Sequence, residues 1–188
     1  MLKTLMDLCA LSGVSGHEDE VREYLKVRAL PCADSVRVDT MGNLIVFKRG
    51  RKHTEQKLLL SAHMDEVGLM IHHITDEGYL KFDTVGGIDR RVLLGKHVVV
   101  GDLKVPGVIG LKAYHLVSAE EEKRLPKQTE FYIDIGARNR AMATEQVKIG
   151  DVAVFQSECV EFGDSMLKAK AIDDRIGCAI LLEILKDP

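Results

Sequence analysis

Hydrophobic positions change their spacing twice along the chain. Near the N-terminus they recur three and four positions apart, which is the spacing of the buried face of a helix. The positions on this face of a first helix are Leu2, Leu5, Met6 and Cys9. The first helix is predicted to end before Gly13. Ser15 and Glu18 have the spacing of a capping box and predict a second helix, which ends near Pro31.

The pattern then becomes that of strands. Residues 35–39 and 44–48 flank the sequence Met41-Gly42-Asn43, which predicts a β-hairpin. Residues 58–62 form a nearly continuous apolar run. Such a run is typical of a strand that is covered on both faces in an α/β sandwich.

From residue 68 to residue 162 the apolar runs are short, rich in β-branched residues and interrupted by glycine. The clearest runs are residues 69–74, 96–100, 108–111, 131–135 and 151–155. Many short strands with regular turn signals predict a small barrel or sandwich. We therefore expect residues 68–162 to be an all-β domain inserted into an α/β domain made of residues 1–67 and 163–188.

Helical spacing returns at the C-terminal end. The apolar positions of this last helix are Ile176, Ala179, Ile180 and Ile184. Only Arg175, Glu183 and Lys186 are left to face water, so the helix is predicted to be buried. Its start carries Asp173 and Asp174, which fit either an N-cap with its neighbour or a pair of acids compensated by a metal ion.

Composition limits the classes of function. The 188 residues are 46% hydrophobic, with a net charge of -3 and a pI near 6.2. These values predict no nucleic-acid partner and no anionic membrane partner. We see no signal peptide and no apolar run near the ~20 residues that a membrane-spanning helix needs. The four cysteines lack C-x-x-C spacing, which favours reduced thiols and a cytoplasmic location.

The strongest candidate chemistry follows the apolar run 58–62. His63 and Asp65 are two residues apart, so on a strand both side chains face the same way. Imidazole is a ligand for zinc or cobalt, and a nearby carboxylate can fix the imidazole tautomer or bind the ion itself. The same pair also fits a surface pair or a histidine with its hydrogen bonds satisfied in a core.

Together, residues 58–68 and 168–185 resemble the corresponding segments of the M42 family of metallo-aminopeptidases, which includes the tetrahedral aminopeptidases and members labelled endoglucanase. Five further stretches resemble the family in the same order: residues 11–21, 39–44, 85–89, 107–110 and 134–137. The resemblance implies an α/β fold, namely a partial αβα sandwich of a zinc-peptidase catalytic domain with an inserted small all-β barrel.

The resemblance also implies the chemistry. His63 would bind one of two divalent metal ions, zinc or cobalt, and Asp173 would bridge both. Asp65 would be the catalytic residue that orients His63 and tunes its basicity. Two such ions can activate water and polarise a peptide carbonyl. The substrates would be short peptides that lose their N-terminal residue, and the full-length protein would be a homo-oligomer.

Further residues of the family site come after the Asp-Asp helix: a general-base glutamate, a glutamate ligand, another carboxylate and a last histidine. None of them can be matched here, since only Glu183 and Asp187 follow as acids. We therefore expect this chain alone to be inactive. The alternative is a catalytically silent fragment whose β-domain acts as an interaction or oligomerisation module. Glycoside hydrolysis would need two flanking carboxylates, and no such pair is evident.

Overall fold

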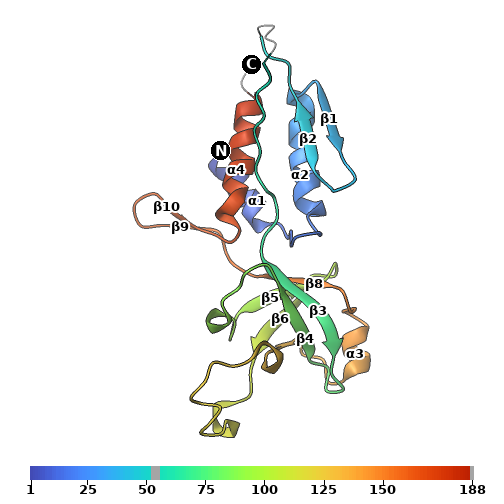
Figure 1. The fold of residues 1–188 in the computed structure, drawn as a ribbon, viewed down its shortest axis with the longest axis vertical. Helices are drawn as coiled ribbons and strands as arrows, with labels where there is room; N and C mark the ends of the chain where they lie inside the picture. Colours follow the sequence, from blue (N-terminus) through green and yellow to red (C-terminus); the bar gives the residue numbers. More distant parts are fainter. Residues whose placement is uncertain (52–55, 187–188) are drawn as a thin grey trace. The chain divides into compact units, whose positions relative to one another are not determined.

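The computed structural model describes residues 1–51 and 56–186, so Asp187 and the end of the predicted segment 163–188 lie outside the described residues. Two compact units are present, one made of Met1–Glu66 with Glu158–Pro188 and the other of Val67–Ser157 (Figure 1). The α/β class with an all-β barrel is confirmed. The assignment of residues 68–162 to an inserted domain stays a prediction.

Three helices build the core of the first unit. They are α1 (Leu2–Ala10), α2 (Asp19–Ala29) and α4 (Ile172–Lys186). The buried side chains between them are Leu5, Leu8, Cys9, Val21, Leu25, Ala29, Cys178, Ala179 and Leu182. Helix α1 ends before Gly13 as expected, but the predicted face is only partly right: Leu5 and Cys9 are buried together with Leu8, whereas Leu2 is 45% exposed and Met6 is half-buried.

The capping box predicted for α2 is wrong. Glu18 is the N-cap residue and makes no side-chain cap hydrogen bond. The Glu18 carboxylate instead accepts a hydrogen bond of 2.7 Å from the backbone N–H of Gly16. Ser15 is not available for capping because its hydroxyl donates to Asp65.

The predicted hairpin is confirmed. Strands β1 (Ser35–Val38) and β2 (Leu44–Phe47) pair antiparallel and lie beside α2 (Figure 1). Asp39 shapes the turn, because its carboxylate accepts hydrogen bonds of 2.9 Å from the backbone N–H groups of Met41 and Asn43. Gly42 has a φ of 84°, a conformation that favours glycine.

The prediction of a buried strand at residues 58–62 is wrong for this chain. No strand is assigned to residues 56–65, and Leu58 and Leu59 are 85% and 89% exposed. An apolar run forms a stable strand only when a neighbour takes up its backbone N–H and C=O groups, and the described residues provide none here. These leucines instead line an apolar groove of about 310 Å³ with side chains from α2, β2 and α4.

Helix α4 is only partly buried, which corrects a second expectation. Arg175 was predicted to face water, yet its side chain is completely buried. Ile180 and Ile184 were predicted to be buried, yet they are 41% and 52% exposed. The apolar pattern alone cannot show which face of an almost wholly apolar helix meets the core, since several faces satisfy the same spacing.

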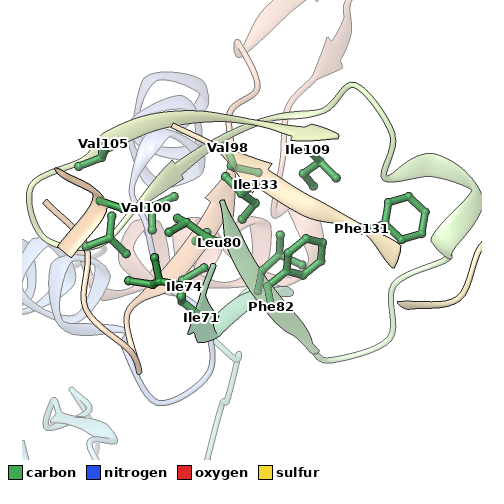
Figure 2. Close-up of a cluster of buried hydrophobic side chains, with 14 of the residues drawn as sticks. Ile71, Ile74, Leu80, Phe82, Val98, Val100, Val105, Ile109, Phe131 and Ile133 are labelled. Carbon is green, nitrogen blue, oxygen red and sulfur yellow. The ribbon is translucent and has the colours of Figure 1, made fainter. Parts of the chain in front are cut away.

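The second unit is a closed antiparallel barrel with the strand order β3-β4-β7-β6-β5-β8. Its strands are β3 (Gly68–Ile74), β4 (Leu80–Val85), β5 (His97–Val100), β6 (Val105–Gly110), β7 (Tyr132–Asp134) and β8 (Val152–Phe155). Strand β4 was not among the predicted runs. Figure 2 shows apolar side chains from these strands gathered inside the barrel, among them Ile71, Leu80, Val98 and Ile133.

Short elements complete the chain. Strands β9 (Val160–Phe162) and β10 (Met166–Lys168) form an antiparallel pair in the first unit, and helix α3 (Arg140–Thr144) belongs to the second. The 3-10 turns are Leu30–Cys32, Arg90–Val92, Tyr114–Leu116 and Gln128–Glu130. Among the described residues, every helix is too short or too polar to cross a membrane.

The barrel core provides a first prediction. Leu80 is fully buried opposite Ile133, so Leu80→Ala should lower the free energy of unfolding of the barrel by about 2–5 kcal/mol. Val108→Ala is the matched control on an exposed position of β6 and should cost less than about 1 kcal/mol. Hydrogen exchange of barrel amides with mass spectrometry measures both, and equal protection in the two variants would contradict this core.

The exposed groove provides a second prediction. A contiguous apolar surface promotes self-association, so the chain should form concentration-dependent oligomers in sedimentation velocity. Replacing both Leu58 and Leu59 by serine should reduce this association. Leu103→Ser is the control, because Leu103 is 70% exposed on the barrel. Identical sedimentation of the double variant and the wild-type chain would show that the groove is not responsible.

Candidate metal centre

Three side chains of the first unit meet at one place. The carboxylate of Asp65 lies 2.8 Å from Nδ1 of His63, as the two-residue spacing predicts for side chains on one side of the chain. The carboxylate of Asp173, at the start of α4, lies 3.1 Å from Nε2 of the same imidazole. The structure thus brings together all three residues predicted from the sequence, although 110 positions separate His63 from Asp173.

The two adjacent aspartates have different surroundings. Asp174 accepts a hydrogen bond of 3.0 Å from the backbone N–H of Gly177, three residues on, which is the geometry of an N-cap. Asp173 has a side chain that is 96% exposed and faces His63. Both residues have non-helical backbone angles, and the peptide bond between them is cis. Asp174 therefore has the position of the N-cap, and a metal ion at Asp173 stays a prediction.

Electrostatic interactions favour the protonated form of His63 and the ionised form of Asp65. Burial lowers the pKa of His63, but hydrogen bonds with Asp65 and Asp173 outweigh it and the net shift is upward. The pKa of Asp65 is lowered, first by the hydrogen bond from Ser15 and further by His63. Asp65 is therefore ionised at neutral pH and suited to accept a hydrogen bond from the Nδ1–H group of His63.

A buried group of charges is centred on Glu66, the residue that follows Asp65. Glu66 is 8% exposed, and its carboxylate lies 2.5 Å from Nζ of Lys170 and 3.6 Å from the guanidinium of Arg175. Lys170 also donates to the backbone oxygen of Leu11 at 2.6 Å. Burial lowers the pKa of both Lys170 and Arg175, while the carboxylate of Glu66 acts in the opposite direction.

The loop between α1 and α2 supplies Ser15, whose contact here the sequence did not predict. The backbone of Val14 forms a parallel β-bridge with that of Glu66, and the N–H of Glu66 donates to the carbonyl of Gly13 at 2.8 Å. Ser15 then donates from its hydroxyl to Asp65. The sequence contained no signal for this contact, because Ser15 precedes Asp65 by 50 positions and matched a local capping pattern.

The residues present fit a metal ion in part. When Nδ1–H of His63 donates to Asp65, Nε2 carries a lone pair that faces the Asp173 oxygen at 3.1 Å, and only a cation or a proton can stabilise that approach. Two ligands of a tetrahedral zinc ion are separated by about 3.3 Å, given bonds of about 2.0 Å. Within residues 1–51 and 56–186, however, no cluster of three or more His, Cys, Asp or Glu side chains could hold a metal ion.

A protein of Acetivibrio thermocellus whose name marks it as a candidate aminopeptidase is 40% identical over 187 residues, which are 100% of this chain and 54% of the relative. The TET1 peptidase of Pyrococcus horikoshii, described as assembling into a tetrahedron or a large octahedral shell, is 40% identical with a TM-score of 0.87. The match covers 100% of this chain and 56% of that structure.

A TET aminopeptidase from a marine sediment archaeon of the Thaumarchaeota has a TM-score of 0.92 at 35% identity, over 98% of this chain and 53% of that structure. This chain therefore spans about half the length of the relatives it matches. The sequence profile described as M42 glutamyl aminopeptidase matches residues 42–187. Because this match covers more than half of the chain, the chain belongs to the M42 peptidase family.

Proposed function

We propose that the chain carries part of the metal site of an aminopeptidase, and that the whole protein removes N-terminal residues from short peptides. The observation that carries the proposal is the approach of His63 Nε2 and Asp173 Oδ1 to 3.1 Å, with Asp65 on the opposite nitrogen of the same ring. Relatives named lysyl aminopeptidase and glutamyl aminopeptidase support this class of reaction.

Each residue has a distinct role in this proposal. His63 would hold one of two divalent ions, zinc or cobalt, through Nε2, and Asp173 would bridge the pair. When bound, such a pair supplies Lewis acidity toward the scissile carbonyl and lowers the pKa of the attacking water. Asp65 accepts the Nδ1 proton, fixes the tautomer of His63 and raises the basicity of Nε2.

The proposal extends to the setting of the protein. Four free cysteines, two of them buried, are compatible with a cytoplasmic location. Assembly into a homo-oligomer is proposed by analogy with a dodecamer of the TET1 peptidase. The peptide substrate would approach the exposed side of Asp173, since that carboxylate is the most exposed of the three groups.

A second candidate function rests on a different observation. The described residues contain no cluster of three or more metal ligands, whereas the barrel has a complete core and a closed ladder of strands. The chain would then be a catalytically silent fragment, and the barrel would act as an interaction or oligomerisation module. Metal binding distinguishes the two candidates.

Adjacent aspartates allow a sharp test of the metal site. Asp173→Asn should weaken Co²⁺ binding by more than about tenfold, because it removes a proposed ligand. Asp174→Asn is the matched control and should bind like the wild-type chain, since asparagine also serves as an N-cap. Isothermal titration and the visible spectrum of Co²⁺ measure the affinity. Equal affinities for the two variants, or no binding to the wild-type chain, would refute the proposed site.

The type of reaction is tested with the same Co²⁺-loaded chain. An aminopeptidase acts on a short peptide with a free N-terminus and leaves the N-acetylated peptide intact. We expect the chain alone to release little or no product, because the general-base glutamate of the family could not be matched in it. Water activation by such a base contributes about 10²–10⁴-fold to the rate. Cleavage of the acetylated peptide would argue against an aminopeptidase.

A further inference from the structure

The backbone places Ser15 against the candidate metal centre. Two contacts fix the loop that carries it: the N–H of Glu66 donates to Gly13 at 2.8 Å, and the N–H of Gly13 donates to the Glu66 carboxylate at 3.1 Å. The parallel bridge between Val14 and Glu66 continues this alignment. Ser15 therefore lies next to Asp65 because of paired backbone, not because of a side-chain conformation alone.

The hydroxyl of Ser15 donates a hydrogen bond to Asp65 and does not cap α2, the helix that follows it. Ser15 is exposed and has the spacing of an N-cap, so its hydroxyl could bond to water or to the start of α2. It donates instead to Oδ2 of Asp65, while Oδ1 of the same carboxylate meets Nδ1 of His63 at 2.8 Å. With both oxygens engaged, the carboxylate cannot rotate away from the imidazole.

We propose that Ser15 is a positioning residue that acts through Asp65 on His63. Its hydroxyl fixes the Asp65 carboxylate, the carboxylate retains the proton on Nδ1, and the lone pair of Nε2 is then directed toward Asp173. The inference rests on the proposed metal site, because the orientation of Nε2 matters only if a cation is bound there. Outer partners of this kind orient a metal-binding histidine and fix its tautomer.

The imidazole tautomer tests this role without any metal. Nitrogen-15 NMR of the full chain, at about pH 9 where an ordinary imidazole is neutral, distinguishes a proton on Nδ1 from one on Nε2. The His63→Ala variant identifies the resonances of His63 among the seven histidines. In the wild-type chain the Nδ1–H form should dominate. Ser15→Ala should increase the Nε2–H form, and Ser15→Thr, which keeps the hydroxyl, should restore the wild-type population.

Ser12→Ala is the control for loosening of the loop, since it removes a hydroxyl three positions away and leaves Ser15 in place. A wild-type tautomer population in Ser15→Ala would overturn the inference. An equal shift in Ser12→Ala, or no rescue by threonine, would also overturn it, because the effect would then reflect the loop and not the hydroxyl.

Co²⁺ affinity separates this inference from the proposed function. Ser15→Ala should bind Co²⁺ about tenfold more weakly than the wild-type chain, and Ser15→Thr should bind within about twofold of it. A wild-type chain that binds no Co²⁺ would refute the metal site, while the tautomer measurement would still decide whether Ser15 positions His63. Unchanged affinity in Ser15→Ala would refute the role of Ser15 and leave the site intact.

Discussion

The buried carboxylate of Glu66 joins three segments of the first unit that are far apart in the sequence. Lys170 and Arg175 bring positive charge to it from the C-terminal end, and the N–H of Gly13 bonds to it from the loop before α2. Removing the Glu66 carboxylate would leave two buried positive charges without an anion, which is strongly unfavourable. The separations among the Ser15 loop, His63 and Asp173 depend on this cluster.

Adjacent residues have opposite roles at both segments of the candidate site. Glu66 points inward to the charge cluster, while its neighbour Asp65 points to His63. Asp174 binds the first turn of α4, while its neighbour Asp173 faces outward. Glu66 and Asp174 thus fix the backbone through their hydrogen bonds, and this backbone carries Asp65 and Asp173. The backbone positions of Asp65 and Asp173 are thereby fixed by the contacts of their neighbours.

The two units differ in how completely they pair their backbone hydrogen-bonding groups and bury their apolar side chains. The barrel pairs every strand with two neighbours and encloses its side chains, so it needs no further partner within the part of the chain described. In the first unit, residues 58–60 leave apolar side chains at the surface of a groove. The relatives that match this chain are about twice as long as it is.

Local spacing was enough to predict the first helix, the hairpin and the barrel strands other than β4, and short motifs were enough to single out His63, Asp65 and Asp173 as candidate residues that the fold brings together. Tertiary structure alone decided which aspartate caps α4, that Arg175 is buried and that Ser15 bonds Asp65. It also decided that residues 58–61 are exposed and form no strand. These outcomes depend on partners that are distant in sequence. A strand needs a neighbouring strand, a buried charge needs an opposite charge, and a hydroxyl needs an acceptor, and only the folded chain brings these partners close.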